Sequence, residues 1–253
     1  MIRAGLVFCI LFFALSTART QIINIEDSRK KIDSVGLFGQ LDLTFSLVQS
    51  SKQLLTFKGT SRADWIRPKG AWMGILDYRV IINEKDNLQD DGFFHLRYGR
   101  LLNKRFTWEA FSQLQHNRQL RIDLRWLAGT GPRFLLYNKP RQKAYLGVLY
   151  MFEYDEIVAS NTIWRDHRLS SYLSVHLQLT PNLDFASTSY YQPLIGNFAE
   201  SRVSSVNSLS FKFTDHLQFR IQFNISYDGR LAKETENVPA TVYNFTNGLR
   251  WAF

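Results

Sequence analysis

The sequence predicts an all-β protein, namely a transmembrane antiparallel up-and-down β-barrel of about 12 strands. Three observations support this prediction. Apolar and polar residues alternate along nearly the whole chain after residue 34, the alternating segments run for about ten to fourteen residues, and the chain ends on an aromatic ridge. Successive side chains of a strand point to opposite faces, so each strand has one apolar and one polar face. Globular strands average about five or six residues, whereas a tilted strand needs about nine to eleven to cross a bilayer.

The first twenty residues predict a cleaved secretory signal peptide. Arg3 supplies a basic start, an apolar run follows from Gly5 to Leu15, and the small residues 16–18 precede the expected cleavage site. This order is typical of a signal peptide, and the apolar run is too short to span a membrane as a helix. The single cysteine, Cys9, lies in this segment, so the exported chain can form no disulfide bond and no thiolate metal site. A retained membrane anchor is the alternative interpretation.

Composition narrows the class of protein further. Once residues 1–20 are removed, 29 Lys and Arg remain against 22 Asp and Glu, a formal charge of +7. A basic chain can bind nucleic acid, an anionic membrane surface or anionic solutes. Here the basic residues are scattered and the chain is predicted to be exported, so we expect no nucleic-acid partner. With 45% hydrophobic residues, we expect a bacterial outer-membrane location, residues 21–34 as a short periplasmic segment and residues 35–253 as one barrel.

Twelve alternating segments follow one another along residues 35–253. They lie near Val35–Leu47, Leu54–Trp65, Ala71–Ile82, Phe94–Tyr98, Phe106–Gln115, Ile122–Trp126, Leu146–Tyr154, Leu169–Leu179, Leu183–Gln192, Val203–Phe213, Leu217–Ile225 and Tyr243–Phe253. An even number places both chain ends in the periplasm, so the first connection, near Gln49–Lys52, lies outside the cell. The longest connections, Asn83–Asp91, Asp155–His167 and Asp228–Pro239, then also fall outside, as expected for a barrel. A β-sandwich with an outward polar face is the alternative.

The polar faces carry the candidate functional groups. Nine charged residues are predicted to line the interior, namely Arg62, Asp77, Arg79, Arg97, Glu109, Asp123, Arg125, Arg220 and Arg250. One interpretation is a narrow, mildly cationic channel that favours small anionic solutes. The other is that acids and bases pair across strands and fill the interior. A barrel of about 12 strands lies between packed eight-stranded barrels and channels of sixteen strands or more, so both interpretations stay open.

The last segment predicts a lipid-facing strand and an assembly signal. From Tyr243 to Phe253 the odd positions are mostly aromatic and the even positions are polar or small. Trp251 and Phe253 are therefore expected to face lipid and, as in outer-membrane barrels generally, to be recognised by the barrel insertion machinery. Arg250 points the other way, towards the interior. Outer-membrane lipids and this machinery are the expected partners, and the sequence does not define the oligomeric state.

Several short motifs resemble those of a known family. They are Gly129-Thr-Gly-Pro-Arg133, Tyr145-Leu-Gly147 with Glu153, Arg168-Leu-Ser-Ser-Tyr-Leu173, Thr188-Ser-Tyr-Tyr-Gln-Pro193 and Ser208-Leu-Ser-Phe-Lys212. Together they resemble the outer-membrane barrels of domain-of-unknown-function family 481, whose better-known members are called salt-induced outer-membrane proteins. The resemblance covers most of the exported chain. It implies a location and an architecture, and it brings no established activity, cofactor or catalytic residue.

Other classes of function have weaker support in the sequence. Ser170, Ser174 and His176 share one predicted inward face, but no acid is fixed beside them, and lipid hydrolysis needs a nucleophile that faces the bilayer. The stretch Asp155–His167 matches no compact cation-binding motif. A structural barrel, or a surface receptor acting through its outer loops with Trp164 as an exposed anchor, is a further alternative. We therefore assign no catalytic, cofactor-binding or metal-binding residue.

Deletion of Phe253 is expected to lower the amount of protein assembled in the outer membrane, because this residue is the predicted end of the assembly signal. The heat-modifiable form in isolated outer membranes, measured by gel shift, reports assembly. Phe213→Ala, which removes an aromatic side chain elsewhere in the chain, is the matched control and should assemble normally. Normal assembly of the shortened chain would contradict the prediction.

Overall fold

The computed structural model describes residues 35–49, 53–83, 86–157, 162–214, 217–234 and 238–251. The predicted signal peptide (residues 1–20) and periplasmic segment (residues 21–34) lie outside the described residues, as does Phe253. Within the described ranges, no helix has the length and apolar character that crossing a membrane requires.

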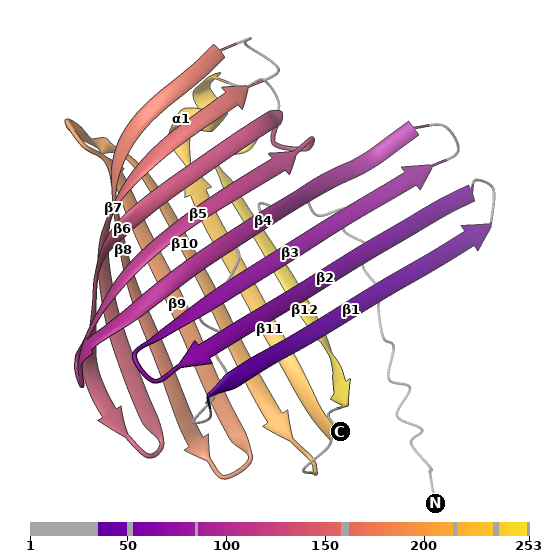
Figure 1. Cartoon of the computed structure of the whole chain (residues 1–253). Coiled ribbons are helices and arrows are strands. Elements are labelled where there is room, and N and C mark those ends of the chain that lie inside the picture. Colours follow the sequence, from indigo (N-terminus) through magenta and orange to yellow (C-terminus); the bar gives the residue numbers. More distant parts are fainter. Residues whose placement is uncertain are drawn as a thin grey trace, which may run out of the picture.

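Twelve antiparallel strands make up almost the whole described chain. They are β1 (Gly36–Gln49), β2 (Gln53–Arg67), β3 (Gly70–Asn83), β4 (Asp86–Asn103), β5 (Phe106–Asn117), β6 (Ile122–Lys139), β7 (Gln142–Ile157), β8 (Thr162–Thr180), β9 (Leu183–Leu194), β10 (Asn197–Lys212), β11 (Leu217–Asp228) and β12 (Thr241–Trp251), with the short helix α1 (Gly229–Glu234) before β12. Each strand pairs with the next along the chain, so the sheet order is β1 to β12 without a crossover. Figure 1 shows this single curled sheet. The prediction of an all-β, antiparallel up-and-down fold is confirmed.

Tight turns form one end of the sheet. Four connections at this end have two residues each: Pro68–Lys69, Lys104–Arg105, Pro140–Arg141 and Pro181–Asn182. Proline suits three of them because its φ angle is fixed near −65° and it has no N–H group to leave unpaired. Backbone bonds to the adjacent strand hold the turns; for example, Leu101 N donates to Lys69 O at 2.9 Å. These connections are as short as the sequence predicts.

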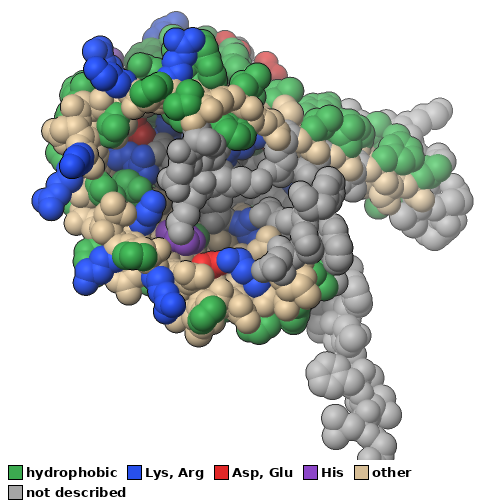
Figure 2. Space-filling model, turned by 60° about the horizontal axis from the view of Figure 1, so that its bottom comes forward, with side chains coloured by type: hydrophobic (Ala, Val, Ile, Leu, Met, Phe, Trp, Pro, Cys, Tyr) green, Lys and Arg blue, Asp and Glu red, His purple; other side chains and the backbone are tan. Residues whose placement is uncertain are grey.

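The strands separate apolar from polar side chains. On β4, Phe94 and Leu96 are 43% and 37% exposed, whereas His95 and Arg97 are 1% and 5% exposed. The same alternation recurs along the sheet, and Figure 2 shows many hydrophobic side chains on its outer surface. Polar and charged side chains occupy the inner face, which is where the candidate site lies.

The two edges of the sheet are not joined within the described residues, where no ladder links β1 to β12. The middle and late strands curl around an interior, and β1 to β3 extend away from it (Figure 1). Apolar side chains of β1 are consequently the most exposed of the described residues, with Leu37 at 75% and Phe45 at 70%. The structure thus contains the predicted up-and-down sheet without its closing seam.

The end opposite the tight turns differs from the prediction. The connections expected at Asn83–Asp91 and Asp155–His167 shrink to residues 84–85 and 158–161, because the strands on either side continue. Ladder bonds join main-chain groups whatever the side chains are, so pairing extends into sequence that lacks a clear apolar face. The expectation of long outer loops is wrong at these two places.

A small apolar cluster lies at this outer end. Its members are Leu120, Ile122, Ile157, Trp164, Leu231 and Val238. Leu231 comes from α1, and the guanidinium carbon of the adjacent Arg230 lies 4.2 Å from the centre of the Trp164 ring. Trp164 is therefore buried in β8 under α1, and the expectation of an exposed Trp164 in a loop is wrong.

A β-bulge at the start of β6 changes which way Asp123 points. Gln115 pairs with Arg125 and Asn117 pairs with Ile122, so two residues of β6 stand opposite one residue of β5. The extra residue shifts the alternation by one position, as β-bulges do. Asp123 is consequently exposed, beside His116, and the prediction that it lines the interior is wrong.

Candidate functional site

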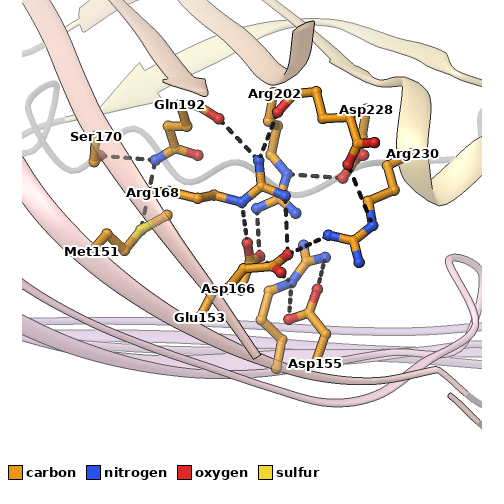
Figure 3. A network of polar contacts seen from close by, with 12 residues as sticks. Met151, Glu153, Asp155, Asp166, Arg168, Ser170, Gln192, Arg202, Asp228 and Arg230 are labelled. Carbon is orange, nitrogen blue, oxygen red and sulfur yellow. Dashed lines mark hydrogen bonds and ion pairs between the residues drawn. The ribbon is translucent and has the colours of Figure 1, made fainter. Parts of the chain in front are cut away.

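Three arginines share one buried carboxylate on the inner face of the sheet. Glu153 on β7 is fully buried. Its Oε1 atom lies 2.8 Å from Nη1 of Arg202 and 3.3 Å from Nε of Arg125, and Arg168 Nε donates to its Oε2 atom. These residues come from β6, β7, β8 and β10, so one carboxylate ties together four strands (Figure 3).

Further acids balance the remaining charge of these arginines. Asp155 accepts two hydrogen bonds from Arg125, at 2.8 and 2.6 Å. Asp228, at the end of β11, accepts from Nε of Arg202 at 2.8 Å. Asp166 lies 3.5 Å from Nη2 of Arg168 and 2.6 Å from Nη1 of Arg230 in α1.

The resulting cluster, which we call the arginine network, contains equal numbers of acids and bases. Its members are Arg125, Glu153, Asp155, Asp166, Arg168, Arg202, Asp228 and Arg230. Removing so many charges from water is costly unless each one is paired and hydrogen-bonded. The formal charges within this network cancel, which explains how the interior can hold them.

Sequence reasoning placed Arg125, Glu153 and Arg202 on the inner face and missed the other members of the network. Asp155 and Asp166 fell in a segment interpreted as a loop, and Arg230 lay in another. The period-two spacing of Glu153 and Asp155, continued by Asp166 and Arg168 on the next strand, is the signal that could have found them.

A second polar cluster lies closer to the tight turns and centres on Glu109. Nη1 of Arg97 lies 3.2 Å from its carboxylate and Nη1 of Arg133 lies 3.8 Å from it. The Tyr172 hydroxyl donates to Oε2 of Glu109 at 2.7 Å. Because Glu109 is on β5 and Tyr172 is on β8, this bond crosses the inner surface of β6 and β7.

Glycines of the family-like motifs make room for that crossing. Gly147 pairs with Tyr172 across β7 and β8. A Cβ atom at Gly147 would lie 2.1 Å from the Tyr172 ring, and one at Gly131 would lie 2.4 Å from the Val148 carbonyl oxygen. Real Cβ contacts do not reach such distances, so the tyrosine ring lies where a side chain would otherwise stand. The motif glycines are thus explained by packing on the inner face.

Two cavities lie on the inner face, and Arg97 borders both. The outer cavity has a volume of about 100 Å³, and Arg125 and Arg202 of the arginine network line it. The turn-side cavity has a volume of about 290 Å³, and Arg62 and Arg133 line it. Arg97 and its partner Glu109 therefore stand between the two spaces, so a solute passing from one to the other meets them.

The remaining predicted residues occupy varied places. Asp77 and Arg79 are buried on β3, where Asp77 accepts a hydrogen bond from the Thr60 hydroxyl at 2.6 Å. Arg62 pairs with Asp64 two residues along β2, and Arg220 is half-buried on β11. The structure brings together Arg97 with Glu109, and Arg125 with Glu153, but not all nine in one site. Arg250 and Trp251 belong to β12, and their side chains lie outside the described part.

The serines considered for catalysis take part in interior hydrogen bonds. Gln192 Nε2 donates to the Ser170 hydroxyl at 3.0 Å, and Thr188 donates to the Ser174 hydroxyl at 3.1 Å. His176 is exposed at the tight-turn end, 3.9 Å from Asp184. Among the described residues, no group of three or more His, Cys, Asp or Glu could hold a metal ion. The charged clusters are therefore the main candidate site.

The fold and the charged inner face define a twelve-stranded up-and-down β-barrel protein. The model of a family described as "Protein of unknown function, DUF481" matches residues 49–248, and the chain belongs to this family. A solved structure described as "NanC porin structure in rhombohedral crystal form" is similar to this chain, with a TM-score of 0.49 and 11% identity over 78% of this chain and 94% of that chain. No curated protein matches the sequence. None of these findings bears on the name "salt-induced".

Replacing Glu153 with Gln is expected to lower the free energy of unfolding by about 3–5 kcal/mol, because three buried guanidinium groups lose the carboxylate they share. Denaturant titration of the folded protein, read by intrinsic fluorescence, measures the loss. Glu156→Gln removes the same charge from the same strand at a site where Tyr154 donates to the side chain. This control should change stability by about 1 kcal/mol or less, and an equal loss in both variants would contradict the role of Glu153.

Proposed function

We propose that the chain is an integral β-barrel of the bacterial outer membrane, inserted by the barrel insertion machinery, and that its interior is a narrow path for small anionic solutes. The separation of an apolar outer face from a charged inner face along twelve consecutive strands carries this proposal. A soluble monomer rarely exposes a contiguous apolar patch larger than a few hundred Å². Lipid would cover this surface, as it covers the outer band of membrane barrels.

Closure of the sheet is part of the proposal. Lipid offers no partner for the N–H and C=O groups of a free strand edge, so β1 and β12 would have to pair with each other in a bilayer. An even number of strands in sequential antiparallel order permits this seam without rearranging any other pair. The exposed apolar side chains of β1 would then join the lipid-facing surface.

The charges around the two cavities support a preference for anions. Arg97, Arg125 and Arg202 line the outer cavity against one acid, Asp228. The turn-side cavity has four arginines, Arg62, Arg67, Arg97 and Arg133, against Asp64 and Glu109. Guanidinium groups in excess along a narrow path lower the electrostatic energy of an anion and raise that of a cation.

A plugged structural barrel is the second candidate, and the neutral arginine network favours it. Charges that cancel one another and are held by several hydrogen bonds can act as filling, and α1 with Leu231 packs against the interior at the outer end. The receptor interpretation has lost its anchor, because Trp164 is buried. Conductance separates the path from the plug.

Planar-bilayer recording of the purified protein tests the proposed path. We expect discrete conductance steps with a higher permeability for chloride than for potassium. Absence of steps at every voltage tested, with protein shown to be folded by its gel shift, would favour the plugged barrel.

Arg97→Gln is expected to reduce the anion-to-cation permeability ratio about fourfold, because one unit charge about 5 Å from an ion in water contributes about 0.8 kcal/mol. The reversal potential in a salt gradient measures the ratio. Arg118→Gln, which removes an exposed charge from the β5–β6 connection, is the matched control and should leave the ratio near that of the unchanged protein. An unchanged ratio in Arg97→Gln would remove Arg97 from the path.

A further inference from the structure

Basic residues gather at the tight-turn end of β2 to β7. The stretches 65–72, 98–108 and 134–145 contain eight Lys and Arg and no Asp or Glu. Seven of the eight are exposed, namely Arg67, Lys69, Arg100, Lys104, Arg105, Lys139 and Arg141. Figure 2, which brings this end forward, shows Lys and Arg side chains projecting around the edge of the molecule. The charge is local, because the two-residue turn Pro181–Asn182 at the same end carries none.

One part of this edge is hollowed into a groove on the outer face. The groove has a volume of about 530 Å³ and its walls are Trp65, Arg67, Lys69, Trp72, Tyr98 and Arg100, which we call the rim groove. Trp65 pairs with Trp72, and Trp72 pairs with Tyr98, so three adjacent strands present one row of aromatic rings. The Trp72 and Tyr98 ring centres are 4.7 Å apart. The groove therefore has an aromatic wall on its membrane side and basic residues at its turn side.

The register of the strands brings the basic residues to the same face as these rings. Arg67 pairs with Gly70, and Gly70 pairs with Arg100, so the two arginines flank a position without a side chain. The guanidinium carbon of Arg67 lies 3.9 Å from the centre of the Trp65 ring. Stacking of this kind orients the planar guanidinium group while its N–H groups stay available at the edge.

Gly70 forms the floor of the rim groove. A Cβ atom at this position would lie 2.9 Å from the Tyr98 hydroxyl oxygen and 3.1 Å from the Gly99 carbonyl oxygen. The hydroxyl therefore lies over the glycine, between the flanking arginines. The turn itself is fixed, since Leu101 N donates to Lys69 O at 2.9 Å. Two guanidinium groups, an ammonium group and a hydroxyl donor thus converge on one small space.

We propose that the rim groove binds the phosphate head group of an anionic phospholipid of the periplasmic leaflet. This inference rests on the outer-membrane placement proposed above, in which the tight turns lie at the periplasmic surface. Arginine pairs bind phosphate oxygens with two parallel N–H bonds, and indole and phenol rings prefer the head-group level of a bilayer. The exposed basic residues on the neighbouring turns raise the local concentration of such lipids.

Lipid titration of the detergent-purified exported chain by native mass spectrometry tests the proposal, with phosphatidylglycerol as the probe and zwitterionic phosphatidylethanolamine as the comparison. We expect tighter binding of phosphatidylglycerol. Arg67→Gln with Arg100→Gln should weaken that binding about 30-fold, which corresponds to about 1 kcal/mol for each basic residue removed. Lys104→Gln with Arg141→Gln removes the same charge outside the groove and should change binding by less than about threefold.

A second variant tests the shape of the groove without changing its charge. Gly70→Ala adds a methyl group that displaces the Tyr98 hydroxyl, so it should also weaken phosphatidylglycerol binding. Equal losses in the two double variants would show general charge attraction and overturn the proposal, as would no loss in any variant. Displacement of the lipid by millimolar inorganic phosphate would identify a site for free anions instead.

The failure of this inference can be told apart from the failure of the proposed function. Each variant is first run on a gel with and without heating, which shows whether the barrel is folded. Absence of a heat-dependent shift in the unchanged protein contradicts the barrel and the lipid site together. A normal shift without a preference for phosphatidylglycerol contradicts the lipid site alone.

Discussion

Alternation of side chains at every second position is the constraint on which the rest of the structure depends. A strand that places Phe94 and Leu96 on one face must place His95 and Arg97 on the other. Twelve such strands paired in sequential order leave one apolar surface and one charged surface. The outer surface then needs an apolar environment, and the inner surface needs internal partners for its charges.

The inner face meets that need with ion pairs that span several strands. Glu153 joins three arginines from β6, β8 and β10, and Arg230 extends the network to α1. Nearer the turns, Tyr172 reaches Glu109 over glycines whose missing side chains leave space for the ring. The same clusters border two cavities with an excess of arginine. Packing and a selective path are therefore two possible uses of one charged surface, and conductance distinguishes them.

The sequence predicts the twelve strands and the tight turns because a period of two and proline-containing turns are local signals. It also predicts the inward Arg97 and Glu109, which lie on regular stretches of alternation. The outward Asp123 escapes prediction because a single inserted residue reverses the phase, and nothing in the local pattern marks it. The pairing of Asp166 with Arg230 escapes because the two residues are 64 positions apart and meet only when α1 folds back. Pattern reading finds faces, and partners across the interior depend on the tertiary fold.

Spin labelling of β4 tests the central claim most directly, since the single cysteine of the chain lies in the predicted signal peptide. Single cysteines are introduced in turn at positions 93–98, labelled, and examined by electron paramagnetic resonance in phospholipid vesicles. Labels at 94, 96 and 98 should collide with oxygen, which concentrates in lipid, and labels at 93, 95 and 97 should be shielded from it. A two-residue period in oxygen accessibility is the predicted result. Labels that are accessible to a water-soluble nickel complex on both faces would contradict the account.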